Sequence, residues 1–229
     1  MKVAVLRFPG SNCDQDAYFS LRDDVGVGAD YVWYEDTSLA GFDAVFIPGG
    51  FSFGDYLRCG AMASRAPIMD EVRRFAEEGR PVIGACNGFQ ILCEMGLLPG
   101  ALLRNESEKF VCEHVYLRAE NRSSFWTRGV DKILRIPIAH GEGRYICDSD
   151  TLKMLQDIER IAFRYVDSVG NVVPDANPNG SMENIAGVLN VRGNVLGLMP
   201  HPERATKALL GSTDGLAILK ALTLVESSL

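Results

Sequence analysis

The chain has 229 residues, of which 47% are hydrophobic and 23% charged, with a formal net charge of −7 and an isoelectric point near 5.0. This length suits one large α/β domain, and the composition lacks the bias of disordered, collagen-like or coiled-coil chains. The acidic balance argues against nucleic acid as a partner, because proteins bind phosphates through clusters of Lys and Arg. The first apolar run, Met1–Leu6, is too short for a signal peptide or a spanning helix, so we expect no membrane association and a cytoplasmic location.

Strand and helix patterns alternate through the first half of the chain. Short apolar runs bounded by turn residues predict strands, and apolar residues three or four apart predict helices. In chain order the predicted elements are a strand at Val3–Leu6, a turn at Pro9–Asp14 and a helix to Leu21, strands at Tyr31–Tyr34 and Ala44–Ile47, a helix at about Ala63–Glu78, a strand at Val82–Ala85 and a helix at Gly88–Met95. This alternation is typical of parallel strands joined by helices.

The second half of the chain contains more strand than helix. Its predicted elements are several β segments between Phe110 and Ile146, a loop that ends in turn residues at Pro174–Ser181, a hairpin of Ile185–Val191 and Val195–Leu198, and a last helix with Ile218, Leu222 and Val225 on its core face. No repeat or linker divides the chain. We therefore predict one α/β domain over residues 1–229, with a mainly parallel central sheet flanked by helices and its ligand site at the carboxyl ends of the strands.

Six cysteines are distributed irregularly, at positions 13, 59, 86, 93, 112 and 147. Without a paired Cys-x-x-Cys, this spacing predicts neither structural disulfides nor a zinc site, and we expect no bound metal. Most of the cysteines should be small core residues. Cys86 is the exception.

Residues Gly84–Gly88 form a Gly-x-Cys-x-Gly element between a predicted strand and a predicted helix. It is the thiol counterpart of the serine nucleophile elbow, in which a sharp turn exposes the nucleophile and leaves no room for side chains two residues away. The following helix N-terminus favours the thiolate of Cys86. Taken alone, the element is equally compatible with a buried cysteine in a tight turn.

A thiolate nucleophile needs a base and a group that orients the base. His201 and Glu203 supply this pair directly after the last predicted strand, between Pro200 and Arg204. Residues two apart in an extended segment point the same way, so Glu203 can reach one ring nitrogen while the other faces Cys86. A lone histidine is more often structural, and only its combination with the elbow favours catalysis.

Attack on an amide also requires two N–H donors for the developing oxyanion. We predict that Asn87, immediately after the nucleophile, supplies one of them. The second is expected from Gly50 or Phe51, in the loop that ends the strand Ala44–Ile47. Without Cys86, the two glycines at 49 and 50 would indicate only a turn.

These groups together resemble a known family. Pro48–Gly50, Gly84–Gly88 with Gln90, and Pro200–Glu203 match in order and spacing the class I (triad) glutamine amidotransferases, over nearly the whole chain. The resemblance implies their flavodoxin-like fold. Within the family, five further stretches are similar to the glutaminase subunits of phosphoribosylformylglycinamidine synthases: Phe8–Asp14, Gly49–Arg58, Cys86–Leu92, Pro137–Tyr145 and Asn177–Ser181. The departures, such as Phe53 and Ala85, replace no reacting group.

The resemblance implies a role for each residue of the site. Cys86 attacks the side-chain amide of L-glutamine to form a thioester, His201 protonates the departing ammonia and later activates water, and Glu203 orients His201. Gln90 is expected to bind the substrate. The segment containing His140, Gly141 and Gly143 is expected to contact the amino or carboxylate end of glutamine.

The resemblance also implies partners. The chain has no Gly-x-x-x-x-Gly-Lys-Ser/Thr loop, so no cofactor is expected in it. A large synthase subunit would use ATP and magnesium to convert formylglycinamide ribonucleotide into its amidine with the ammonia produced here, during purine synthesis. A small accessory subunit would complete the complex. We expect low activity of the isolated chain, with the loop around Gly50 reshaped on docking.

Three alternatives remain open at this point. The chain could serve another amidotransferase, in pyridoxal phosphate, histidine or anthranilate synthesis, with the same three reacting residues. It could be a catalytically silent scaffold domain, although the complete set of Cys86, His201 and Glu203 argues against that. It could also be a cysteine hydrolase or peptidase on a similar sheet, in which case a peptide would be cleaved and glutamine ignored.

Overall fold

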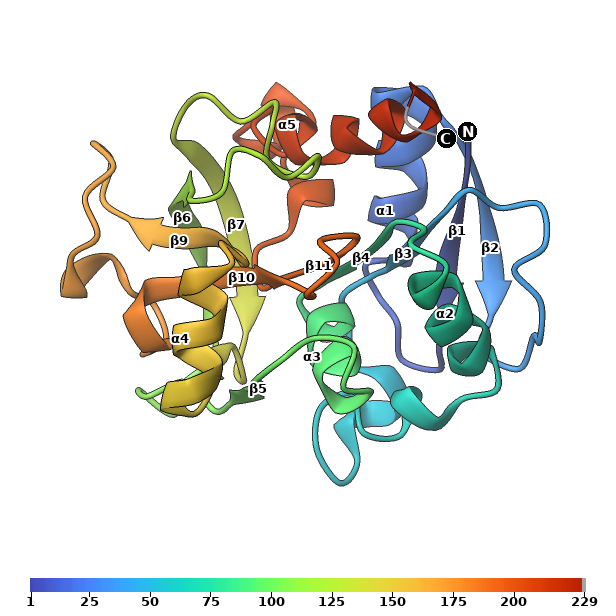
Figure 1. The fold of residues 1–229 in the computed structure, drawn as a ribbon, viewed down its shortest axis with the longest axis horizontal. Coiled ribbons are helices and arrows are strands. Elements are labelled where there is room, and N and C mark those ends of the chain that lie inside the picture. The colour runs from blue at the N-terminus through green and yellow to red at the C-terminus, as the bar shows by residue number, and fades with distance from the viewer. Residues whose placement is uncertain (228–229) are drawn as a thin grey trace.

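The computed structural model describes the backbone of residues 1–227 and the side chains of residues 1–224. Its main sheet has nine strands in the described residues, in the order β2-β1-β3-β4-β11-β10-β9-β6-β7 (Figure 1). These strands are β1 (Lys2–Arg7), β2 (Gly28–Trp33), β3 (Ala44–Ile47), β4 (Val82–Ala85), β6 (Val111–Ala119), β7 (Leu134–His140), β9 (Ile161–Val166), β10 (Ile185–Leu189) and β11 (Val195–Leu198). A separate pair consists of β5 (Ala101–Leu103) and β8 (Arg144–Ile146).

The sheet has a parallel half and an antiparallel half. Strands β2, β1, β3, β4 and β11 all run parallel to their neighbours. From β11 onwards, the strands β10, β9, β6 and β7 pair antiparallel. The predicted parallel sheet flanked by helices is therefore confirmed, and the late hairpin β10–β11 joins it to the antiparallel extension.

Helices cover both faces of the parallel half (Figure 1). On one face, α1 (Asp14–Phe19) and α5 (Leu216–Leu219) pack against alternate strand residues such as Val3 and Val5. On the other face, α2 (Ile68–Glu77) and α3 (Asn87–Glu94) pack against the intervening residues. Strands buried on both faces are apolar throughout, which explains why β3 and β4 are continuous apolar runs in the sequence.

Several helix boundaries differ from the prediction. The helix expected from Ala63 is interrupted by Pro67, because the residue before a proline is driven out of the helical region; Ala66 accordingly has a ψ of 148° and α2 begins at Ile68. The first helix continues beyond Leu21 as a π-helical turn, Ser20–Val25, and ends at Gly26 with a φ of 81°. Strand β2 begins at Gly28, three residues before the predicted Tyr31.

The loop expected between residues 146 and 174 is wrong. This stretch contains α4 (Ser149–Asp157) and β9, a strand in the middle of the antiparallel half. A start signal for α4 was present in the sequence, since the Asp148 side chain caps the helix by accepting a hydrogen bond from Thr151 N at 2.7 Å. Strand β9 has the sequence IAFRYV, an apolar run that also fits a buried strand.

At the carboxyl-terminal end, the predicted helix is α5 followed by a 3-10 stretch, Lys220–Ser227. Ile218 and Leu222 are buried as predicted, whereas the side chain of Val225 lies outside the described residues. Within residues 1–227, no helix combines the length and apolarity needed to cross a membrane. All six cysteines are free thiols, but the expectation that most of them lie in the core is wrong. Cys13 and Cys86 are buried, three others are partly exposed and Cys112 is exposed.

Candidate active site

Cys86 occupies the predicted turn between β4 and α3. Its backbone has φ 51° and ψ −106°, a conformation that is strained for a residue with a side chain. The flanking glycines are needed for packing: a Cβ on Gly84 would lie 2.6 Å from the Gly88 carbonyl group, and a Cβ on Gly88 would lie 2.0 Å from Ile47 O on β3. The nucleophile elbow is therefore present, and Cys86 is 6% exposed.

The sheet brings His201 to the same edge as Cys86. His201 follows β11, which pairs parallel with β4 in a register that places Leu198 beside Ala85. Cys86 N donates a hydrogen bond to Leu198 O at 2.8 Å, which fixes the elbow against the end of β11. Because both residues follow the carboxyl ends of neighbouring parallel strands, Cys86 and His201 line one cavity of about 130 Å³.

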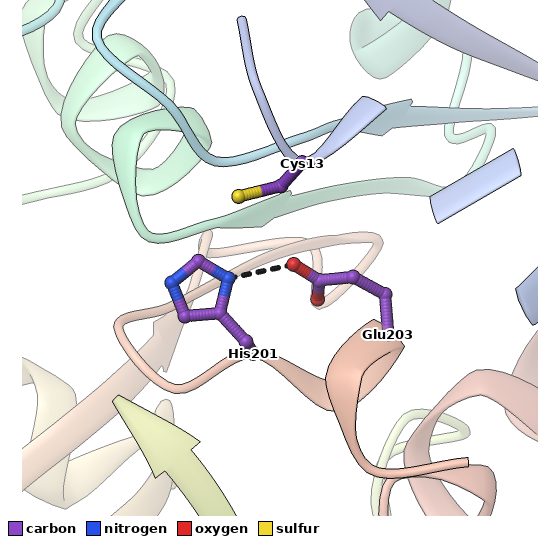
Figure 2. Close-up of side chains that lie close together, drawn as sticks. All are labelled: Cys13, His201 and Glu203. Atoms are coloured by element: carbon purple, nitrogen blue, oxygen red, sulfur yellow. Dashed lines mark hydrogen bonds and ion pairs between the residues drawn. The ribbon is translucent and has the colours of Figure 1, made fainter. Parts of the chain in front are cut away.

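His201 and Glu203 form the predicted pair, at 2.6 Å between His201 Nδ1 and Glu203 Oε1 (Figure 2). The contact arises differently from the prediction, because only His201 is extended and a 3-10 turn, Pro202–Arg204, begins directly after it. Both side chains are buried. Within the described part of the chain, His201 Nε2 has no hydrogen-bond partner. That nitrogen is therefore available for proton transfer to a substrate.

The surroundings of His201 favour its charged form. Burial alone would lower its pKa, but the negative charges of Glu203 and Cys86 outweigh burial and raise the pKa well above the usual value. An imidazolium beside a thiolate is the charge state that a cysteine nucleophile needs.

We expect Glu203→Gln to reduce kcat/KM for the reaction of Cys86 by about 10²- to 10⁴-fold, since the imidazole loses its orienting carboxylate. Because Glu203 raises the pKa of His201, the variant should also lose activity at a lower pH on the alkaline side of its profile, where His201 deprotonates. The measurement is kcat/KM between pH 5 and about pH 10. Asp16→Asn, which removes the carboxylate paired with Arg204, is the control and should keep the original profile. A Glu203→Gln profile unchanged in height and position would contradict the assigned role.

A second thiol, which the sequence analysis assigned to the core, lies beside this pair. Cys13 is 2% exposed, and its side chain points toward the imidazole ring in Figure 2. Atoms of Cys13, His201 and Glu203 that could bind a metal lie within 4.8 Å of one another. Burial raises the pKa of Cys13, so it remains a neutral thiol. The Nδ1 atom of His201 is already bonded to Glu203, and we retain the prediction that no metal is needed.

Two of the three predicted oxyanion donors, Asn87 and Gly50, are compatible with that role, which stays a prediction. The Asn87 N–H is at the first position of α3, where no preceding turn supplies an acceptor. Gly50 has a φ of 143°, a conformation reserved for glycine, and lines the same cavity as Cys86. The Phe51 assignment is wrong for this conformation, because its N–H donates to Gly10 O at 3.0 Å. Phe51 could serve only if the loop were reshaped.

Gln90 lines a second cavity beside Cys86, of about 170 Å³, and also connects two parts of the site. Its Oε1 accepts from Asn87 Nδ2 at 2.8 Å, and its Nε2 donates to Glu142 O at 2.6 Å. Each end of the amide retains one further hydrogen-bonding position, so contact with a substrate is still possible.

The side chain of His140 is buried and bonded within the protein, so it is not available to bind a substrate. Its Nδ1 lies 3.1 Å from Asn105 Oδ1, and burial followed by the charge of His201 lowers its pKa to about 4, which keeps it neutral. The ring packs directly against Gly143, where a Cβ would lie 2.3 Å from it. His140 and Gly141 line the second cavity, so this segment can still contact a substrate through main-chain groups.

Sequence analysis missed several residues that line the two cavities beside Cys86. Asn12, Cys13 and Arg204 lie on the His201 side, Asp55, Cys59 and Glu142 lie on the other, and Phe110 borders both. Asn12, Cys13, Asp55 and Glu142 lie in stretches that resemble the family, which was the one signal for them, whereas Cys59, Phe110 and Arg204 lie outside those stretches.

The chain is similar to glutamine amidotransferases in sequence and in structure. Residues 1–214 match the model of the CobB/CobQ-like glutamine amidotransferase domain. A structure of PurLQS from Thermotoga maritima is 46% identical, with 97% of each chain covered and a TM-score of 0.85. A candidate GMP synthase component from Thermoplasma acidophilum is 14% identical over 100% of this chain and 94% of that one, with a TM-score of 0.65. A glutamine amidotransferase from Thermotoga maritima is 16% identical, with 99% and 98% covered and a TM-score of 0.60. The last two show a shared fold only.

Proposed function

Since this chain belongs to the CobB/CobQ-like glutamine amidotransferase family, we propose that it hydrolyses L-glutamine through a thioester on Cys86 and supplies the ammonia to a synthase subunit. The observation that carries the proposal is the buried His201–Glu203 pair, 2.6 Å apart, in one cavity with a nucleophile elbow. A scaffold domain would have no use for the strained backbone of Cys86.

The chemistry proceeds in two halves. The Cys86 thiolate attacks the amide carbon of glutamine, and the N–H groups of Asn87 and Gly50 stabilise the oxyanion. When the carbon–nitrogen bond breaks, His201 gives its Nε2 proton to the departing ammonia, which leaves a glutamyl thioester. Neutral His201 then takes a proton from water, which attacks the thioester and releases glutamate and the thiol. Glu203 holds the tautomer of His201 throughout.

We further propose that the acceptor is formylglycinamide ribonucleotide, bound by a large synthase subunit that uses ATP and magnesium, with a small accessory subunit in the complex. The similarity to PurLQS, 46% identity over 97% of both chains, supports this assignment. The chain itself is expected to need no cofactor. We also keep the expectation that the isolated chain has low activity and that docking to the synthase reshapes the loop around Gly50 and raises it.

The test is alkylation by 6-diazo-5-oxo-norleucine, a glutamine analogue, followed by mass spectrometry and peptide mapping. One adduct on Cys86 that glutamine prevents is the expected result, and adding the synthase should accelerate labelling. The other buried thiol beside His201, Cys13, is the internal control and should stay unmodified, because its backbone is not an elbow and its pKa is raised. Labelling that glutamine does not prevent, or no labelling of Cys86 in the complex, would overturn the proposal. Ammonia transfer to a different acceptor would retain the hydrolysis and replace only the partner.

A further inference from the structure

The space around Cys86 consists of two lobes. The lobe that contains His201 has a volume of about 130 Å³, and the second has a volume of about 170 Å³. Five residues border both: Gly50, Phe51, Cys86, Phe110 and Ala139. We call the second the acidic lobe, because two carboxylic acids, Asp55 and Glu142, line it. Cys59 and Gln90 are also among its lining residues. A substrate bonded to Cys86 therefore has His201 on one side and the acidic lobe on the other.

The carboxylate of Asp55 lies in an unfavourable electrostatic environment. Burial raises the pKa of Asp55, a hydrogen bond from Cys59 lowers it, and the negative charge of Glu142 raises it again. Burial and both carboxylates raise the pKa of the Cys59 thiol between them, so Cys59 stays a neutral thiol. Among the described residues, Arg104 is the basic residue that approaches Glu142, at 3.9 Å between Nε and Oε1. A cation inside the lobe would relieve this repulsion.

Asp55 is held firmly in the lobe. It ends a 3-10 turn, Ser52–Asp55, whose first N–H donates to Asn87 Oδ1 at 3.2 Å. Asn87 Nδ2 also approaches Asp55 Oδ1 at 3.5 Å. Asp55 has a φ of 55°, a conformation that aspartate and asparagine tolerate better than most residues. The elbow helix and the carboxylate are thus fixed relative to each other.

We propose that Asp55, assisted by Glu142, binds the α-ammonium group of glutamine and thereby selects free glutamine over amides that lack this group. The inference rests on the proposed glutamine hydrolysis. In extended glutamine, the α-nitrogen lies about 5 Å from the amide carbon. With the amide carbon at Cys86 and the leaving nitrogen toward His201, the amino acid end extends into the acidic lobe. A charge-assisted hydrogen bond to a carboxylate is the interaction an ammonium group prefers.

The test compares glutamine with glutaramate, which is glutamine without its amino group, in ammonia release by the full chain in the presence of its synthase. Asp55→Asn preserves shape and backbone conformation. It should lower kcat/KM for glutamine on the order of 10- to 100-fold, mainly through KM, and leave that for glutaramate unchanged. The ratio of the two kcat/KM values therefore falls, which a general disturbance of the site would not cause. Glu142→Gln should lower the ratio less, because Arg104 offsets part of its charge.

Glu94→Gln is the matched control. Glu94 pairs with Arg58 in the loop that follows Asp55 and lies outside both lobes, so its variant removes one nearby negative charge and should keep the ratio. An unchanged ratio in folded Asp55→Asn overturns the assignment, and if that variant does not fold, the ratio in Glu142→Gln decides. Failure of the parent chain to hydrolyse glutamine would instead overturn the proposed function.

Discussion

Cys86→Gly should abolish glutamine hydrolysis and still give a more stable fold than Cys86→Ala. Both variants lose the nucleophile, so ammonia release should fall by about 10⁴-fold or more. The φ of 51° and ψ of −106° at this position lie in a region that glycine adopts freely and alanine does not. The strain in such a conformation amounts to about 1–3 kcal/mol, and only glycine relieves it. The free energy of unfolding should therefore be higher for Cys86→Gly by about that amount.

Urea unfolding of both variants and of the parent measures this difference, and ammonia release measures activity. In a reconstituted complex, synthesis with added ammonium salt should persist in both variants, because that reaction bypasses Cys86. Equal stability of the glycine and alanine variants would show that the elbow stores no strain. Glutamine-dependent activity in Cys86→Ala would exclude Cys86 as the nucleophile.

Gly88→Ala should cost about 3 kcal/mol or more of folding free energy. An alanine Cβ would lie 2.0 Å from Ile47 O, a backbone atom of β3 that has no flexible side chain to move. The first turn of α3 would have to withdraw from the sheet and carry Cys86 with it. Gly88 lies inside a helix, where the exchange of glycine for alanine normally stabilises by about 1 kcal/mol, so the steric term reverses the expected sign.

Gly79→Ala provides the matched control for this steric effect. Gly79 has a φ of 84° and open space where the Cβ would lie, so only the backbone cost of about 1 kcal/mol is expected. Urea unfolding should rank the parent first, Gly79→Ala second and Gly88→Ala last. Stability of Gly88→Ala equal to that of the parent would mean that α3 and β3 are not in the close contact described.

The sequence predicted the parts of the fold that depend on local pattern. The apolar runs Ala44–Ile47 and Val82–Ala85 became β3 and β4 with the predicted bounds, because strands buried on both faces contain little else. The failures have local causes too. The apolar period from Ala63 onwards predicts one continuous helix, but Pro67 breaks it in the structure. The cap signal of Asp148 is a single polar residue, and the predicted loop overlooked it. The order in which β11 and β10 join the two halves of the sheet depends on pairing between distant strands, which no local pattern contains.

The candidate site divides in the same way. Cys86, His201 and Glu203 have reactive side chains in distinctive surroundings, so sequence reasoning identifies them. Cys13 and Asp55 were missed because their importance comes from position in space. A β-bridge between Ser11 and Gly50 holds the loop that contains Cys13 beside the loop that follows β3. In that second loop, Asp55 itself has a left-handed backbone conformation. Such placement depends on contacts that form only when the sheet is assembled.

The central position of β11 has a consequence for the timing of enzyme activity. This strand lies between β4 and β10, although every other strand of the described sheet precedes it in the chain. Until it is in place, His201 cannot approach Cys86 and the oxyanion pocket has no neighbouring wall. Pairing of segments so distant in sequence is also intrinsically slow. A nascent or truncated chain that ends before β11 can therefore present the elbow thiol without the base, so glutamine is not consumed by incomplete protein.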